Sequence, residues 1–168
     1  MNDAVHLRPW GPADRDLLAT LNSDPVQMEH VGGAETAAKI AERQERYARD
    51  PHQLVIVAGG ESAGWVGFWE REWRDEQGAD ELVYEIGWSV LPAFQGRGLA
   101  TRGTLLAVEV AREAGGAGAI HAFPGVDNAA SNAVCRRAGF TLSEAGRAIT
   151  FDYPPGSTIV CNDWRLTL

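Results

Sequence analysis

The stretch between residues 81 and 123 limits the fold of this chain more than any other part of the sequence. Apolar and polar side chains alternate over residues 81–90, which predicts a strand. Residues 98–114 carry apolar residues at helical spacing, and residues 119–123 predict a second strand. A strand, a helix of about 17 residues and another strand form a βαβ unit, whose two strands run parallel. The sequence therefore predicts a sheet that contains a parallel pair.

The rest of the chain predicts further elements around this unit. Upstream, the predicted strands are residues 5–8, 54–57 and 64–73, and the predicted helices are residues 13–21 and 35–49. Downstream, Asp127 or Asn128 caps a helix that runs to about residue 137, and residues 140–168 predict strands. The hairpin-like upstream strands are expected to be antiparallel. We predict an α/β fold in a single domain over residues 1–168, with one mixed, mostly antiparallel sheet and helices on both faces.

Residue spacing also predicts which side chains share a face in two of these elements. In the helix over residues 98–114, one stripe is expected to face the core and contains Leu99, Leu106, Val110 and Ala114. In the strand over residues 81–90, Leu82 is expected to share one face with four other large apolar residues, whereas Glu85 lies on the opposite face.

Composition excludes several classes of protein. The chain has 23 acidic and 15 basic residues and a formal net charge of −8. A binder of nucleic acid or of an anionic membrane needs a basic face and is not expected, whereas a cationic partner such as an amine is favoured. The sequence has no transmembrane or signal-peptide pattern. Cys135 and Cys161 form neither a disulfide framework nor a zinc-binding spacing. We therefore predict a metal-free protein of the reducing cytoplasm.

The segment Gln95-Gly-Arg-Gly-Leu-Ala100 joins the predicted strand to the predicted helix and predicts an anion site. Its two glycines allow positive φ angles and a close approach of the backbone to a ligand. The first N–H groups of the helix point into this loop, an arrangement suited to phosphate or pyrophosphate. A Walker A loop is excluded because Leu99 and Ala100 replace its Lys-Ser/Thr pair. A dinucleotide loop is excluded because Thr101 takes the place of the third glycine.

Two motifs resemble the GNAT superfamily of N-acetyltransferases. The segment Val90-Leu-Pro-Ala-Phe-Gln-Gly-Arg-Gly-Leu-Ala100 is similar to the family's acyl-CoA loop, Gln/Arg-x-x-Gly-x-Gly/Ala, with Val-x-Pro before it. The segment Asn128-Ala-Ala-Ser131 and the helix that closes in Gly139-Phe140 resemble the family's second motif. Leu7-Arg-Pro-Trp, and Asp24-Pro25 followed by Gly32-Gly33, resemble the subgroup of ribosomal-protein N-terminal acetyltransferases.

The resemblance implies a site for acetyl-CoA, the acyl-donor cosubstrate. The loop amides would hold the pyrophosphate, the edge of the strand before the loop would pair with the pantetheine amides, and the Asn128 side chain would hold the pantetheine arm. The two parallel strands would splay apart around the thioester. The residues predicted to bind acetyl-CoA are Trp88, Ser89, Val90, Gln95, Gly96, Arg97, Gly98, Leu99, Ala100, Thr101, Asn128 and Ser131.

Three residues are candidates for proton transfer. An amine acceptor must lose a proton before it attacks, so a general base is needed. Glu85 is the first candidate and His121 on the neighbouring strand is the second, with a water chain as a further alternative. The family often has a Tyr five residues before its Gly-Phe pair, and here Cys135 stands in that place. Cys135 is therefore the candidate acid for the leaving thiolate, and a buried cysteine of the core is the alternative.

These observations predict an acetyl-CoA-dependent N-acetyltransferase that transfers the acetyl group directly to a primary amine. The acceptor is a small molecule or a protein N-terminus, and the sequence does not choose between them. A non-catalytic acyl-CoA-binding regulatory module is the alternative. A homodimer is left open. Pro154 and Pro155 are expected to stiffen a loop over the acceptor cleft.

Overall fold

The computed structural model describes residues 4–74, 77–151 and 157–168, and the chain divides into two compact units. The first unit comprises residues 1–67 and 88–104, and the second comprises residues 68–87 and 105–168. Three elements contribute to both units: strands β3 (Glu61–Arg74) and β4 (Asp80–Val90), and helix α3 (Leu99–Ala114).

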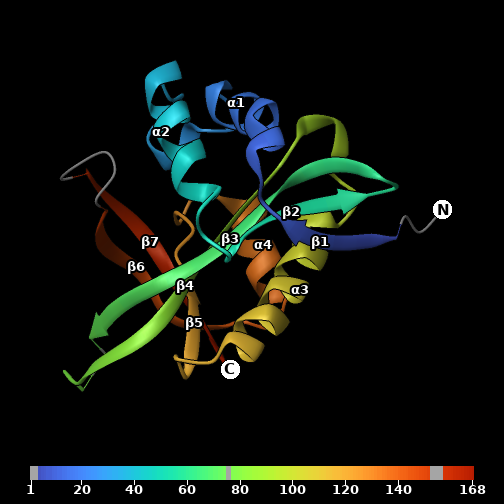
Figure 1. Cartoon of the computed structure of the whole chain (residues 1–168). Helices are drawn as coiled ribbons and strands as arrows, with labels where there is room; N and C mark the ends of the chain where they lie inside the picture. The colour runs from blue at the N-terminus through green and yellow to red at the C-terminus, as the bar shows by residue number, and fades with distance from the viewer. Residues whose placement is uncertain (1–3, 75–76, 152–156) are drawn as a thin grey trace. The chain divides into compact units, whose positions relative to one another are not determined.

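The first unit has the strand order β1-β2-β3-β4 (Figure 1). Strand β1 (Val5–Pro9) pairs antiparallel with β2 (Gln53–Ala58), and β2 pairs antiparallel with β3. The β2–β3 turn passes through Gly59 and Gly60, which both have positive φ angles. The expected antiparallel arrangement of the upstream strands is confirmed.

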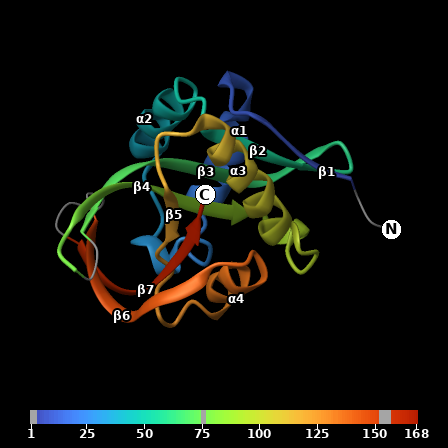
Figure 2. The same cartoon turned by 90° about the horizontal axis from the view of Figure 1, so that it is seen from below.

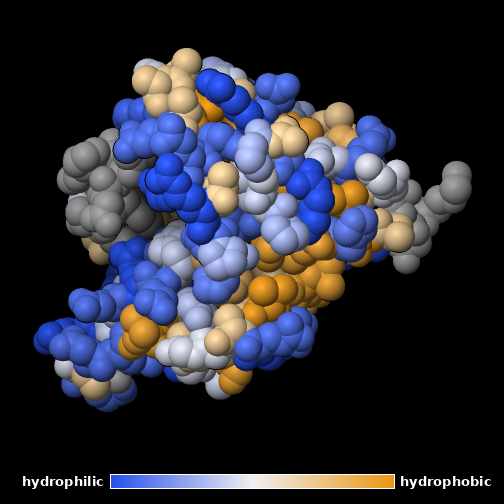
Figure 3. Space-filling view, viewed as in Figure 1, coloured by the Kyte–Doolittle hydropathy of each residue, from blue (hydrophilic) through white to orange (hydrophobic). Residues whose placement is uncertain are grey.

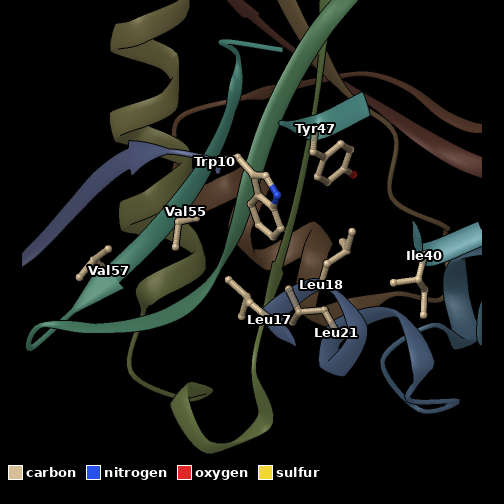
Figure 4. Packing of buried hydrophobic residues seen from close by; sticks show 8 residues of the cluster. All are labelled: Trp10, Leu17, Leu18, Leu21, Ile40, Tyr47, Val55 and Val57. Carbon is tan, nitrogen blue, oxygen red and sulfur yellow. The ribbon is translucent and has the colours of Figure 1, made fainter. Parts of the chain in front are cut away.

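Helices cover both faces of β2 in the first unit. On one face, α1 (Arg15–Ser23) and α2 (Ala37–Tyr47) form a buried cluster with Val55 and Val57, and Figure 4 shows the side chains of this cluster. On the other face, Ile56 meets α3 so closely that a Cβ on Gly103 would lie 2.6 Å from its Cδ1 atom. Ile56 points to this face because strand side chains alternate between faces, and a residue larger than glycine at position 103 would force its side chain to move. The predicted helices on both faces are confirmed here.

The second unit has the strand order β3-β4-β5-β7-β6 (Figures 1 and 2). Its further elements are β5 (Ala119–Ala122), α4 (Ala129–Arg137), β6 (Thr141–Phe151) and β7 (Ser157–Thr167). Strands β4 and β5 are parallel, whereas β7 is antiparallel to both β5 and β6. The predicted mixed, mostly antiparallel sheet of an α/β fold is therefore confirmed. The single domain stays a prediction, and Pro154 and Pro155 lie outside the described residues.

Most of the apolar stripe predicted for α3 does not face the core. Leu106 of α3 is 37% exposed, and Figure 3 shows hydrophobic residues at the surface over this helix. Leu99 is the only member of the predicted stripe that is fully buried, and the other buried residues of the helix are mostly small: Gly103, Thr104, Ala107, Val108 and Ala111. Small residues let a helix approach a strand closely, and the large residues are left outside. In β4, the apolar face is buried at Tyr84, Ile86 and Val90, whereas Leu82 at its start is 43% exposed. Glu85, on the opposite face, is buried as well.

Candidate active site

The loop between β4 and α3 has the backbone geometry of an anion site. A short 3-10 helix, η3 (Pro92–Phe94), leads to Gln95, and the chain then turns through Gly96 and Gly98. These two glycines have φ angles of 73° and 72°, which other residues adopt only with strain. A Cβ on either glycine would meet nothing within 4 Å, so the space beside the loop is open. The two glycines therefore serve the backbone conformation and leave room for a ligand.

The start of α3 supplies the donors of this site. The helix begins at Leu99, and the Arg102 N–H donates to the Gly98 carbonyl at 3.1 Å. The N–H groups of the first turn have no acceptor within their own helix and carry the positive end of its dipole. Residues 95–98 are exposed, whereas the Leu99 side chain is 2% exposed and anchors the turn. The Arg97 guanidinium lies over the Phe94 ring, 5.2 Å from its centre, which adds a positive charge to the exposed loop.

The end of β4 presents one backbone edge to β3 and the other away from it. The Leu91 N–H donates to the Ala63 carbonyl of β3 at 2.9 Å. The Ser89 carbonyl points the same way, because a Cβ on Gly64 of β3 would lie 2.3 Å from its oxygen. Since backbone groups alternate along a strand, Trp88 and Val90 direct their N–H and C=O groups to the opposite edge. A ligand that adds to this edge therefore finds Trp88 and Val90, and meets Ser89 only through its side chain.

Gln27 is a residue of this site that sequence analysis missed. Its Nε2 donates to the Val90 carbonyl at 2.7 Å, and its Oε1 accepts from Gln95 Nε2 at 2.9 Å. Gln95 Nε2 also lies 3.0 Å from the same Val90 carbonyl. No signal in the sequence marks Gln27, because it is brought to β4 from 63 residues away.

Glu85 is buried and held by two neighbours on β3. Its side chain forms an ion pair with Arg71, and the Trp69 indole also hydrogen bonds to its carboxylate. Burial raises the pKa of Glu85 above its ordinary value, and Arg71 opposes this effect. A carboxylate with a raised pKa is a stronger base than an exposed one, so the environment suits proton acceptance as well as ion pairing.

His121 lies opposite Glu85 at the last paired position of the two parallel strands. The pairing of β4 with β5 covers Tyr84–Ile120 and Glu85–His121. His121 Nδ1 lies 2.7 Å from Asp163 Oδ1, and both side chains are buried. A carboxylate accepts hydrogen bonds, so Nδ1 carries a proton in this contact. Nε2 has no hydrogen-bond partner among the described residues.

Cys135 is buried in α4. It is 0% exposed, and burial raises the pKa of its thiol to about 12. A thiol with this pKa holds its proton more tightly than an ordinary thiol, whose pKa is about 8.5. The geometry therefore favours the alternative interpretation of Cys135 as a core residue, and its role as an acid stays an untested prediction.

Asn128 and Ser131 form the N-terminal cap of α4. The Asn128 side-chain oxygen accepts a hydrogen bond from the Ser131 N–H at 3.0 Å, which leaves the amide Nδ2 as the donor for a ligand. One turn further, Asn132 Oδ1 accepts from Asn162 and from the Trp164 indole, each at 2.8 Å. These bonds hold the start of α4 against β7 and so fix the direction of the Asn128 cap.

Residues 4–74, 77–151 and 157–168 contain neither a metal-binding cluster nor a membrane-spanning helix. Among these residues, no group of three or more His, Cys, Asp or Glu side chains is arranged to hold a metal ion. None of the described helices combines the length and the apolar composition that a membrane span requires.

Comparison with known proteins identifies a family over most of the chain. The sequence model described as "Acetyltransferase (GNAT) domain" matches residues 4–141. No curated protein matches the chain by sequence.

Solved structures share the fold at low sequence identity. A GNAT-family acetyltransferase from Bacillus anthracis is 16% identical, with a TM-score of 0.73 over 100% of this chain and 96% of its own. YncA from Salmonella typhimurium, solved with its cofactor acetyl-CoA, is 23% identical, with a TM-score of 0.73 over 98% and 94% of the two chains. The Salmonella typhimurium acetyltransferase that modifies the N-terminal serine of ribosomal protein L7/L12 is 19% identical, with a TM-score of 0.72 over 98% and 95%.

Proposed function

The chain belongs to the GNAT family of acetyltransferases and is an acetyl-CoA-dependent N-acetyltransferase, and from this premise we propose which residues carry the reaction. The observation that supports the proposal best is the loop from Gln95 to Thr101. It combines two glycines with positive φ angles, an exposed backbone and the N-terminus of α3. These are the features that bind a pyrophosphate, and we propose that they bind the pyrophosphate of acetyl-CoA.

We propose that the pantetheine arm adds to the edge of β4 at Trp88 and Val90. The N–H groups on this edge point away from β3, and we propose that one of them donates to the oxyanion that forms when the amine attacks the thioester. Positioning the two substrates side by side lowers the activation free energy by several kcal/mol, or by about 7 kcal/mol when the alignment is good.

The proton of the amine is proposed to leave through the Glu85–His121 pair. Glu85 stays the first candidate because burial raises its pKa, and because it lies on β4 three residues before Trp88. His121 is the second, because its buried Nε2 has no hydrogen-bond partner among the described residues. A water chain that leads to either group remains an alternative for an acceptor that does not reach the strand.

The leaving thiolate needs a proton or a stabilising dipole. We retain Cys135 as the candidate acid, although a thiol with a pKa of about 12 is a weak proton donor. The reaction then depends on dipoles and on solvent more than on Cys135.

For the acceptor we propose a primary amine, without choosing between a protein N-terminus and a small molecule. The net charge of −8 favours a cationic amine. One structural relative modifies the N-terminal serine of a ribosomal protein, so we include both protein N-termini and small amines. We place the reaction in the cytoplasm, because Cys135 and Cys161 are both free thiols. A homodimer is left open.

The test is acetyl transfer measured as the release of free CoA thiol over a panel of amines. We expect acetyl-CoA to raise the melting temperature and at least one amine to accelerate thiol release. No comparison supports the alternative of a non-catalytic module. Tight binding of acetyl-CoA without turnover on any amine would nevertheless favour it, and stabilisation by ATP but not by acetyl-CoA would contradict the cofactor.

A further inference from the structure

The carbonyl of Val90 is the last backbone acceptor on the outer edge of β4, and its hydrogen bonds are already made. Leu91 bonds to β3 through its N–H, so the Val90 carbonyl points to the opposite edge. There it accepts from Gln27 Nε2 at 2.7 Å and from Gln95 Nε2 at 3.0 Å. A carbonyl oxygen has two lone pairs. A ligand strand that extends along β4 must therefore end before this atom or displace one of the two amides.

Gln27 also fixes the side chain with which the acetyl-CoA loop begins. Its Oε1 accepts from Gln95 Nε2 at 2.9 Å, so the two side chains and the Val90 carbonyl form a closed set of three hydrogen bonds. Gln95 is exposed, and without Gln27 its side chain would keep only its bond to the Val90 carbonyl. The bond that Gln95 donates to Gln27 restricts the rotation of the Gln95 side chain before the ligand binds. Less side-chain entropy is then lost on binding.

The segment that carries Gln27 is itself held in place. The Val26 N–H donates to Asp24 Oδ1 at 2.8 Å, and the Met28 N–H donates to the Asp24 carbonyl at 3.1 Å. Met28 is 8% exposed and its carbonyl accepts from the Gly33 N–H at 2.8 Å. Gln27 thus lies between the turn at Asp24 and the buried Met28, which fix the backbone from which its side chain reaches Val90 of β4.

We propose that Gln27 is a positioning residue for acetyl-CoA: it closes the outer edge of β4 at Val90 and holds Gln95 at the start of the loop. The inference rests on the proposed function, since it assumes that the ligand occupies this loop. Gln27 acts through Val90 and Gln95, and it is not required to touch the acetyl group.

Gln27→Met tests the proposal, because it keeps the length of the side chain and removes both hydrogen bonds. We expect the KM and Kd for acetyl-CoA to rise about fivefold, with kcat changed less than twofold. Val26→Ala is the matched control, because Val26 is the neighbouring residue and is 78% exposed. Gln27→Glu keeps the acceptor for Gln95 but replaces the donor with a charge against the Val90 carbonyl, so it is expected to weaken binding further.

A double-mutant cycle with Gln95→Ala separates positioning from a general structural effect. If Gln27 works through Gln95, the double variant binds acetyl-CoA about as well as Gln95→Ala alone. Fully additive losses, or a Gln27→Met variant that binds like Val26→Ala, overturn the proposal. Wild-type protein that does not bind acetyl-CoA would instead contradict the proposed function, so the two failures are distinguishable. Melting temperatures of all variants show whether a loss of binding reflects a loss of folding.

Discussion

At the scale of single residues, Glu85 can be tested through the pH dependence of the reaction. A general base must be deprotonated, so kcat/KM falls as the pH drops through its pKa. Because burial raises the pKa of Glu85, this fall is expected at a higher pH than for an exposed glutamate. Glu85→Gln is expected to lower kcat about 100-fold and to remove this fall. Steady-state rates between pH 5 and 9 measure both effects.

Two matched variants decide which group is the base. Glu70→Gln removes a charge from an exposed position on β3 and is expected to leave the profile unchanged. If Glu85→Gln keeps the fall at low pH and His121→Gln removes it, His121 is the base. Because Arg71 loses its partner in Glu85→Gln, the rates are compared only after the melting temperature has been measured.

Cys135 gives a second prediction at this scale. We expect Cys135→Ala to keep turnover within about twofold and to lower the free energy of unfolding by about 1 kcal/mol, because it leaves a small cavity. We also expect the thiol to resist alkylation in the folded protein, since it is 0% exposed and has a pKa of about 12. Turnover is measured as thiol release, and stability by urea denaturation.

The matched control is Cys161→Ala. Cys161 is 1% exposed and burial raises the pKa of its thiol to about 11, so it is likewise a buried thiol with a raised pKa. A tenfold loss of kcat in Cys135→Ala but not in Cys161→Ala, at equal melting temperature, would show that Cys135 is the acid after all.

At the scale of elements, the turn from β4 into α3 can be tested against a matched glycine in another turn. Gly98→Ala puts a Cβ at a φ angle of 72°, and Gly60→Ala puts one at 86° in the turn between β2 and β3. Neither Cβ meets an atom within 4 Å. Both variants should therefore lose about 1 kcal/mol of stability to strain. Only Gly98→Ala is expected to weaken acetyl-CoA binding, by tenfold or more, as measured by calorimetry. Equal affinities of the two variants would contradict the pyrophosphate site.

The element scale also explains what the sequence could predict. The βαβ unit and its glycine loop follow from local patterns: alternation in β4, helical spacing in α3, and two glycines between them. The buried face of α3 could not be predicted in the same way. Hydrophobic spacing selects Leu106, whereas the contact of Gly103 with Ile56 selects small residues for the buried face. Close approach between two elements is a property of the pair and leaves no periodic signal in either.

The same reason limits prediction of the candidate site. The proposed acetyl-CoA loop is contiguous in sequence, so one local pattern predicts all of its residues together. Gln27 and Asp163 were missed because their partners lie 63 and 42 residues away, at Val90 and His121. A glutamine in a turn and an aspartate in a strand have no local pattern that marks them. Only the folded sheet brings these side chains to the atoms that they orient.

At the scale of the whole molecule, the net charge of −8 has a consequence for the choice of acceptor. A negative protein attracts a cation over a range set by the Debye length, which is about 30 Å at 0.01 M ionic strength and about 8 Å at 0.15 M. At saturating acetyl-CoA, kcat/KM for a dication such as 1,4-diaminobutane should fall several-fold between these conditions. A zwitterionic amino acid of similar length is the control, and its kcat/KM should change little. Equal salt dependence for both acceptors would show that the charge of the molecule does not select the amine.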